Sequence, residues 1–229
     1  MQAEFDYRLR VRGRFACFSR PEATVDRVSY EVPTPSAMRG MLSAIFWKPQ
    51  IMWLIKEIAI VKPGSMISFG RNGLKNAVPS NLRPLSVGAG GSDFTQRGML
   101  LLSDVEYVIS ATMVAGPGKH EPGTYAEMFE RRIIRGTYFR KPCLGLREFV
   151  CDVEPAGDDI EIQPISKDLG VMLYDIIYRK EGQPFPLFFK PELKDGRINV
   201  DPADVLPEGV REEFIACLSQ HSHAMPTST

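Results

Sequence analysis

The stretch FDYRLRVRGRFAC at residues 5–17 alternates apolar and basic side chains. Because successive side chains of a β-strand point to opposite faces, this alternation predicts a strand with one packing face and one guanidinium-lined face. Its arginines would follow one another at about 7 Å, close to the phosphate spacing of an extended nucleic acid strand. Solvated arginines, or arginines neutralised by acidic strands nearby, are the alternatives. The apolar residues are Phe5, Tyr7, Leu9, Val11, Phe15 and Cys17, and the arginines are Arg8, Arg10, Arg12 and Arg14.

A helix and a second strand are predicted after this stretch. Thr34 can cap the helix, and Pro35 suits its first position, where a backbone N–H would have no helical partner. Apolar residues within 38–46 follow the i, i+3, i+4, i+7, i+8 pattern of an amphipathic helix, and Pro49 ends it. Residues 51–61 are mostly β-branched or apolar and predict a buried strand.

The middle of the chain alternates ordered segments with turn-rich ones. Residues 66–77 predict an irregular hairpin arm. Residues 79–98 contain Pro, Ser, Asn and several glycines with little periodicity, and predict a long glycine-rich loop. Residues 99–115 predict a strand or hairpin that enters the core. After a turn-rich loop at 116–123, residues 124–135 predict a helix with apolar residues on one side and arginines in its last turn.

These elements together predict a ferredoxin-like domain. Gly136 ends the second helix, and residues 146–153 predict a closing strand. The order strand, helix, strand, strand, helix, strand is the split βαβ arrangement. We therefore assign the chain to the α+β class, with a ferredoxin-like, RRM-like domain over residues 1–154. The open sheet face of such a domain can serve as an RNA platform.

Beyond Glu154 short apolar runs alternate with Gly, Pro and Asp. They predict a small antiparallel β-sheet domain over residues 155–219, to which residues 207–218 could add a short helix. Residues 220–229 are polar and predict a flexible tail, which makes His221 and His223 poor candidates for catalysis. The short strands are expected at residues 160–162, 171–178, 186–190 and 197–200.

The composition is that of a globular protein. The 229 residues include 28 Lys and Arg, 28 Asp and Glu, and 44% hydrophobic residues. No apolar stretch approaches the roughly 20 residues that cross a bilayer, and the N-terminal residues are charged, so we expect a cytoplasmic protein with no membrane partner. Its cysteines show neither CxxC spacing nor clustering, so neither a disulfide framework nor a zinc site is indicated.

The balanced charge conceals an uneven distribution along the chain. Residues 1–150 carry a net charge of +8, and residues 151–229 carry −8. A basic N-terminal part joined to an acidic C-terminal part suggests a polyanionic partner for the first. A single globule in which the two surfaces mix is the alternative, and charge alone leaves both readings open.

His120 and Lys119 are the strongest candidates for chemistry, and they share a loop bounded by glycine and proline. Histidine in general transfers protons near neutral pH, and a neighbouring lysine can stabilise a phosphate or a developing oxyanion. An ordinary exposed loop pair is the alternative. No His, Asp or Glu cluster with ligand spacing lies near them, and no phosphate- or dinucleotide-binding glycine motif is present, so we expect neither a metal site nor a cofactor.

Two further groups of residues could contact nucleic acid. Phe46 and Trp47 could offer stacking surface to a base, with Lys48 close by for a phosphate. An apolar helix stripe is the alternative, which we favour for Phe46, while Trp47 and Lys48 stay open. A second, basic group could hold RNA phosphates. It comprises Arg131, Arg132, Arg135, Arg140 and Lys141.

Four sequence blocks resemble, in order and spacing, the CRISPR-associated Cas family five, subtype d. This family is the repeat-RNA endonuclease of type I-C systems and belongs to the RAMP superfamily. The resemblance spans roughly residues 1–155, and its most specific parts are the Trp-Lys-Pro and Gly-Lys-His blocks. The four blocks are Ser29–Thr34, Ala44–Pro49, Gly118–His120 and Leu144–Glu148.

The resemblance implies a ferredoxin-like domain, a glycine-rich region and a small C-terminal β domain. It also implies metal-independent cleavage of precursor CRISPR RNA at the base of the repeat hairpin. The 2′-hydroxyl attacks the adjacent phosphorus, leaving a 2′,3′-cyclic phosphate and a 5′-hydroxyl, so DNA cannot be cleaved. Lys119 and His120 match the family's lysine and histidine. The protein would then keep the processed RNA and join the interference complex with its large and backbone subunits.

Phe46 occupies the position of the family's third catalytic residue, a tyrosine. A phenyl ring has no proton to give, so the hydroxyl's role would pass to His120, to Lys119, to Tyr30 or Tyr125, or to no group. A non-catalytic RNA-binding subunit of the same complex is therefore the second hypothesis. A general nucleic-acid binder that also takes up duplex DNA is the third, and it follows from the basic half alone.

Overall fold

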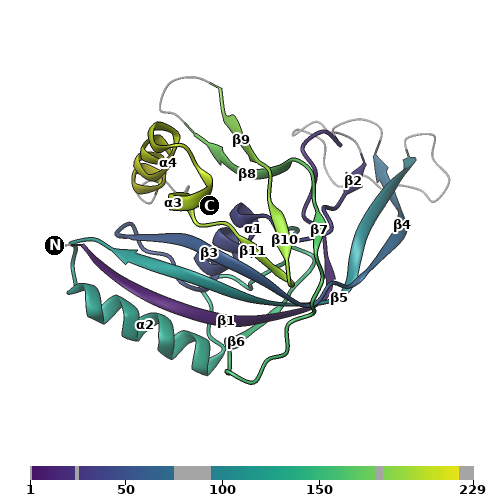
Figure 1. The fold of residues 1–229 in the computed structure, drawn as a ribbon. Coiled ribbons are helices and arrows are strands. Elements are labelled where there is room, and N and C mark those ends of the chain that lie inside the picture. Colours follow the sequence, from purple (N-terminus) through teal and green to yellow (C-terminus); the bar gives the residue numbers. More distant parts are fainter. Residues whose placement is uncertain (1, 24–25, 75–93, 179–182, 222–229) are drawn as a thin grey trace, which may run out of the picture.

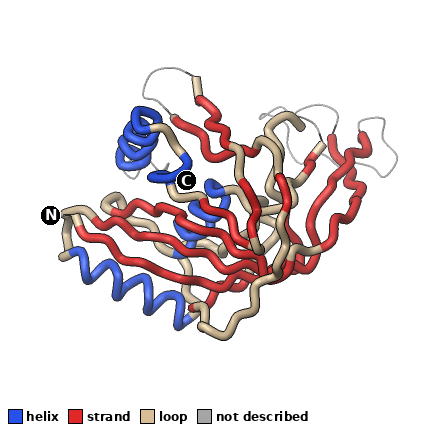
Figure 2. The backbone as a smooth tube through the Cα atoms, in the orientation of Figure 1, coloured by secondary structure: helices blue, strands red, loops and turns tan. Residues whose placement is uncertain are grey.

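The computed structural model describes residues 2–23, 26–74, 94–178 and 183–221. Its strands form one large sheet, antiparallel except for a short parallel pair, and a small second sheet of two strands (Figures 1 and 2). The strands are β1 (Ala3–Ala16), β2 (Arg27–Val28), β3 (Ile51–Lys62), β4 (Ser65–Leu74), β5 (Phe94–Ala115), β6 (Asp152–Pro155), β7 (Lys167–Asp168), β8 (Met172–Ile177), β9 (Phe185–Phe189), β10 (Glu192–Lys194) and β11 (Arg197–Asn199). The helices are α1 (Pro35–Ile45), α2 (Pro122–Arg135), α3 (Pro202–Val205) and α4 (Glu208–His221).

β1 confirms the alternation seen in the sequence. Leu9 and Val11 are buried, and the ring of Tyr7 packs edge-on against Phe129 of α2, with the ring centroids 4.7 Å apart. α2 runs along the sheet beneath β1 (Figure 1). The arginines of β1 occupy the even positions and therefore the other face.

The two long helices begin and end for reasons the sequence contains. Thr34 caps α1, because its Oγ1 accepts a hydrogen bond of 3.3 Å from the N–H of Ala37. α2 begins at Pro122, two residues before the predicted start, and ends at Gly136, whose φ of 61° is easy for a residue without Cβ. α1 contacts β3, α2 contacts β1, β5 and β6, and the two helices contact each other.

The order of the large sheet is β6–β1–β5–β3–β11–β10–β7, with β2 and β4 pairing with β5. α1 connects β1 to β3, and α2 connects β5 to β6; in each case the two strands are parallel and another strand lies between them. This order agrees with the split βαβ arrangement. The closer assignment to a ferredoxin-like domain stays a prediction.

The strands of the C-terminal part are divided between the two sheets. β11 pairs with β3, and β10 and β7 follow it, so these strands extend the large sheet. Only β8 and β9 form the small second sheet. The division of the chain at residue 154 therefore rests on no sheet boundary and stays a prediction.

The predicted strands at 171–178, 186–190 and 197–200 are confirmed as β8, β9 and β11. The one predicted at 160–162 is wrong. That segment forms no ladder, and the nearby contact is a single hydrogen bond of 2.9 Å from the Gln163 N–H to the Ile60 carbonyl. Local apolar composition cannot show whether a neighbouring strand is available for pairing.

The predicted strand at 146–153 is also misplaced, since residues 144–149 form bends and a turn and β6 begins at Asp152. The Leu144 N–H donates to the Phe149 carbonyl over 2.9 Å, which folds this segment back on itself. Leu146 and Phe149 then pack in a small second cluster with Phe15. The apolar signal here comes from that cluster and not from a strand.

Two predicted irregular segments are partly ordered. The hairpin arm is confirmed as β4 paired with β5, and β5 begins at Phe94, so residues 94–98 are strand and not loop. The rest of the predicted loop, residues 79–93, lies outside the described residues. Gln220 and His221 belong to α4 and not to a tail, and His223 lies outside the described residues.

Candidate functional site

The loop with Lys119 and His120 connects β5 to α2 and rests on two residues. The Gly116 N–H donates to the Gln50 carbonyl over 2.8 Å, and the His120 N–H donates to the Tyr125 hydroxyl over 3.4 Å. The imidazole also meets the Tyr125 ring edge-on, with ring centroids 5.7 Å apart. Tyr125 itself is 1% exposed, so it provides a fixed support for the loop.

Gly118 makes this close packing possible. A Cβ at this position would lie 2.5 Å from Cγ of Gln50 and 2.8 Å from the Tyr125 hydroxyl oxygen. With glycine there, the loop lies directly on its support, Lys119 is exposed and His120 is half-buried. Lys119 forms no ion pair with any described residue, so its ammonium group is available to an anion.

Phe46 does not reach the surface. It caps the C-terminal end of α1 and is 1% exposed, with its ring centroid 6.4 Å from that of Phe129 and 5.0 Å from the guanidinium carbon of Arg132. His120 rests on Tyr125, one helical turn before Phe129, and no ring contact or hydrogen bond among the described residues joins Phe46 to His120. The structure therefore brings Lys119 and His120 together but leaves Phe46 in the core.

Trp47 and Lys48 follow α1 and are half-buried. The ring of Trp47 lies beside that of Phe139, with the centroids 6.3 Å apart and the planes at 31°. The sequence analysis missed Phe139, which is 49% exposed. An exposed aromatic residue directly before Arg140 and Lys141 was the signal that could have identified it.

The arginines of β1 are mostly paired. Arg8 lies 3.5 Å from the carboxylate of Asp158, and Arg12 lies 3.3 Å from that of Glu154. Nε of Arg10 donates to the carboxylate of Glu106, a residue that is 4% exposed, over 2.6 Å. Of the four, only Arg14 forms no ion pair with a described residue; its guanidinium lies 5.2 Å from the centre of the Phe15 ring.

The basic residues near the end of α2 have a different environment. Arg131, Arg135, Arg140 and Lys141, here called the α2 basic cluster, are exposed and form no ion pair with a described residue. Arg132 instead donates from Nη1 to the Ile45 carbonyl over 2.8 Å and so joins α2 to the end of α1. The N–H of Arg140 donates to the Ala44 carbonyl over 2.7 Å, which holds the cluster beside the same helix end.

The acidic C-terminal half supplies many partners for the basic N-terminal half. For part of the surface, ion pairs between the two parts confirm the alternative in which basic and acidic surfaces mix within a single globule. Among the described residues, the cations without a carboxylate partner include Lys119, Arg14, Lys48 and the α2 basic cluster. The pairs that join the two halves in this sense are Arg8–Asp158, Arg10–Glu154, Arg12–Glu154, Arg39–Asp175 and Lys56–Asp201.

Three of the four cysteines offer little nucleophilic character. Burial raises the pKa of Cys17, Cys143 and Cys151 above the usual thiol value, so these thiols stay protonated at neutral pH.

No group of three His, Cys, Asp or Glu side chains placed to hold a metal ion occurs among the described residues. Within the same residues, no helix is both long and apolar enough to span a membrane.

Comparison with known proteins extends over nearly the whole chain. Two relatives, from Thermus thermophilus and Mannheimia succiniciproducens, are each named CRISPR pre-crRNA endoribonuclease Cas5d. The first is 36% identical over 224 residues, 90% of this chain and 95% of the relative. The second is 41% identical over 214 residues, 85% of this chain and 94% of the relative.

The fold and the family model point the same way. A crystal structure described as a CRISPR-associated protein superimposes with a TM-score of 0.63 at 24% identity, covering 87% of this chain and 93% of the other. The family model described as CRISPR-associated protein (Cas_Cas5) matches residues 6–201. The chain therefore belongs to the Cas5d family of CRISPR-associated proteins.

Proposed function

We propose that this protein is an endoribonuclease that cleaves CRISPR repeat hairpins in precursor crRNA. The observation that carries the proposal is the 117–120 loop, where Gly118 lets Lys119 and His120 stand side by side on the buried Tyr125. Both relatives described above carry the corresponding activity in their names. A ferredoxin-like domain, with β6, β1, β5 and β3 as its four strands, is the fold we propose for this part of the chain.

The proposed reaction is a transesterification within the RNA strand. The 2′-oxygen attacks the adjacent phosphorus, the bond from phosphorus to the 5′-oxygen breaks, and the products carry a 2′,3′-cyclic phosphate and a 5′-hydroxyl. His120 transfers protons: one leaves the 2′-hydroxyl and one reaches the departing 5′-oxygen. Lys119 stabilises the negative charge that builds on the phosphoryl oxygens. No metal ion takes part in this scheme.

Phe46 packs against Phe129 in the core and supplies no proton. Two tyrosines, Tyr30 and Tyr125, could take over the role of the family's tyrosine hydroxyl. The hydroxyl of Tyr30 accepts a hydrogen bond of 3.2 Å from the N–H of Leu173 in β8. Tyr125 is the one that meets His120, but it is buried and so cannot touch the RNA. We assign Tyr125 a positioning role, in which its hydroxyl and ring fix the backbone and imidazole of His120.

Binding would use the unpaired cations around the loop. Lys48 and the α2 basic cluster would hold RNA phosphates, and Arg14 is the best placed of the β1 arginines to add to them. Arg8, Arg10 and Arg12 would contribute less, because carboxylates already neutralise them. After cleavage the cytoplasmic protein would keep the RNA and join the large and backbone subunits of the type I-C interference complex.

A second candidate function is a non-catalytic RNA-holding subunit of the same complex. The observation that favours it is Phe46, which has no hydroxyl where the family has one and which is also buried.

Binding of duplex DNA is a further candidate that follows from the basic surface. Competition of labelled repeat RNA by unrelated duplex DNA measures that binding directly.

The test uses end-labelled type I-C repeat hairpin RNA in the presence of EDTA. The wild type should cut once, and His120→Ala should lower the cleavage rate by about 10²- to 10⁴-fold. A single 2′-deoxy substitution at the cut site should abolish cleavage by the wild type, because it removes the nucleophile.

Tyr125→Phe should slow single-turnover cleavage a few-fold without changing RNA affinity, since it removes one hydrogen bond to the His120 backbone.

The outcomes separate the candidates. Cleavage that survives the 2′-deoxy substitution contradicts the proposed mechanism, and cleavage that needs added metal contradicts the metal-independent scheme. If the wild type binds the hairpin tightly but does not cut, the RNA-holding subunit is the function. Phe46→Tyr then tests whether the missing hydroxyl is the reason.

A further inference from the structure

A cavity of about 300 Å³ lies beside the candidate cleavage site. Its walls come from α1, the start of β3, the end of β8, α4 and the segment after α2. This volume is at the small end of the roughly 300–1,000 Å³ typical of ligand pockets, so it suits one planar group. The residues that matter to the argument are Arg39, Trp47, Trp53, Phe139, Arg140 and Tyr178.

Part of the cavity lining offers a stacking surface next to a cation. The rings of Trp47 and Phe139 lie side by side, with centroids 6.3 Å apart, and Phe139 is 49% exposed. The guanidinium carbon of Arg140 is 5.5 Å from the centre of the Phe139 ring. The backbone here is anchored, because the N–H of Phe139 donates to the Ile45 carbonyl over 3.1 Å. Aromatic rings beside arginine are the usual platform for an unstacked base.

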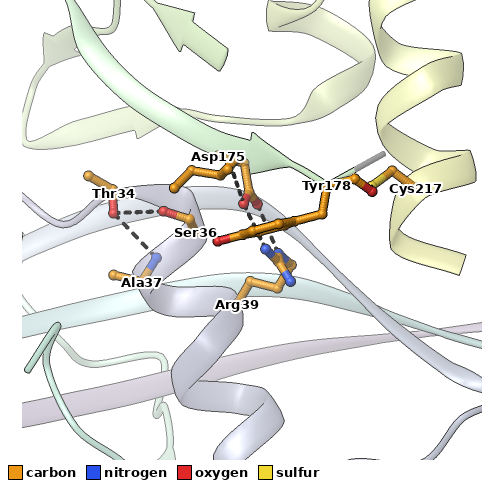
Figure 3. Close-up of polar contacts among 8 residues, drawn as sticks. Thr34, Ser36, Ala37, Arg39, Asp175, Tyr178 and Cys217 are labelled. Carbon is orange, nitrogen blue, oxygen red and sulfur yellow. Dashed lines mark hydrogen bonds and ion pairs between the residues drawn. The ribbon is translucent and has the colours of Figure 1, made fainter. Parts of the chain in front are cut away.

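The cavity lining also includes an arginine in a fixed orientation. Nε and Nη2 of Arg39 donate to the two carboxylate oxygens of Asp175 over 2.9 and 2.7 Å, and Asp175 is 3% exposed. Figure 3 shows this pair with the ring of Tyr178 beside it. Nη1 of Arg39 donates to no described residue, so it can donate to an acceptor on a bound group.

The cavity is also placed where RNA would pass. Ile51 lines it, and the preceding residue, Gln50, accepts the hydrogen bond from Gly116 at the start of the 116–120 loop. Arg140 lines it, and neither Arg140 nor the next residue, Lys141, has a carboxylate partner among the described residues. A negatively charged chain along these cations would carry its bases past the opening.

We propose that this cavity binds one unpaired nucleobase of the bound RNA. The base stacks on Phe139 and Trp47, Arg39 donates from Nη1 to an acceptor on the base edge, and Arg140 holds the adjoining phosphate. A paired base cannot enter, because its edge is occupied and its faces are stacked. The site therefore selects RNA with an unpaired nucleotide beside the hairpin, an inference that rests on the proposed function.

The experiment places a single 2-aminopurine at each unpaired position of the repeat hairpin RNA in turn. Stacking on an aromatic ring quenches its fluorescence, so binding to the wild type should quench one position more than the others. Phe139→Leu, which keeps an apolar side chain but removes the ring, should restore that fluorescence and weaken RNA binding roughly tenfold. Phe188→Leu is the matched control, because Phe188 is 44% exposed and does not line the cavity.

The results separate this inference from the proposed function. If the RNA binds and is cut, but no position is selectively quenched or Phe139→Leu behaves like Phe188→Leu, the base pocket is wrong and the endoribonuclease proposal stands. If Phe139→Leu leaves RNA affinity intact but prevents assembly with the other subunits, the cavity takes a protein side chain. If the hairpin RNA does not bind the wild type at all, both proposals fall.

Discussion

The arginine row of β1 and the α2 basic cluster carry similar charge but differ in what surrounds them. Arg8, Arg10 and Arg12 each lie within ion-pair distance of a carboxylate. No residue of the α2 basic cluster does so among the described residues. A row of arginines in a sequence is thus not by itself an RNA-binding surface, because neighbouring strands decide how much of its charge is left.

The cause of the difference lies in the position of each element. β1 lies between β5 and β6, which bring Glu106 and Glu154 opposite its arginines in the sheet register. The α2 basic cluster lies at the C-terminal end of a helix, where backbone carbonyls already favour cations without neutralising them. The first region therefore has its charge neutralised within the sheet, and the second keeps the charge that the proposed RNA binding requires.

The largest expected effect is on stability, at Arg10, the β1 arginine that pairs with a buried carboxylate. Arg10→Ala leaves the Glu106 carboxylate, which is 4% exposed, without its main partner, and should lower the free energy of unfolding by about 3 kcal/mol. Urea denaturation measures this. The double variant Arg10→Met/Glu106→Leu should recover most of the loss, because it removes both charges together. A single variant as stable as the wild type would contradict the structural role.

The second prediction concerns RNA binding by the α2 basic cluster. Arg131→Ala/Arg135→Ala should weaken hairpin RNA binding on the order of tenfold at physiological salt and lower the slope of log affinity against log salt by about 1.5. Stability should change little, because both side chains are exposed and unpaired among the described residues. Fluorescence anisotropy at several salt concentrations gives both numbers. An unchanged slope would remove the cluster from the RNA interface.

The third prediction uses the paired arginines as the matched comparison. Arg8→Ala/Arg12→Ala also removes two positive charges. In the wild type these two arginines form ion pairs with Asp158 and Glu154, and in the variant the carboxylates lose these partners. We expect the salt slope to fall by less than half of the change caused by Arg131→Ala/Arg135→Ala. The same anisotropy titration decides it. Equal changes in the two double variants would show that pairing does not remove the β1 row from RNA binding.

The smallest effect is expected at an exposed pair outside both regions. A hydrogen bond from its own backbone N–H, and then the Arg27 guanidinium, hold the pKa of Glu148 below its usual value. A carboxyl whose pKa is lowered in the folded state stabilises the protein above its unfolded pKa, and this contribution is lost as the pH falls through the folded pKa.

Glu148→Gln should therefore cost at most about 1 kcal/mol near neutral pH, because half of the side chain is exposed and water screens the pair. The difference from the wild type should shrink as the pH falls below the ordinary value of 4.5. Thermal unfolding at a series of pH values measures it. A difference that grows in acid would reverse the sign of this linkage.

Secondary structure was predictable wherever a local signal was complete. The alternation of β1, the cap at Thr34 and the stop at Gly136 all involve contacts between residues near in sequence, and the structure confirms each. Residues 146–149 and 160–162 were misread, because Leu146 and Phe149 pack in the cluster with Phe15 and residues 160–162 join no ladder. Pairing partners far apart along the chain leave no trace in local composition.

The sequence by itself determined the residue types and spacing of the candidate site, above all Gly118, Lys119 and His120, and with them the family. Only the tertiary structure decided which of the named residues are available. It places Phe46 in the core and Tyr125 under His120, and it sets carboxylates against the β1 arginines. Burial and ion pairing depend on which segments meet across the fold, and no local pattern contains that.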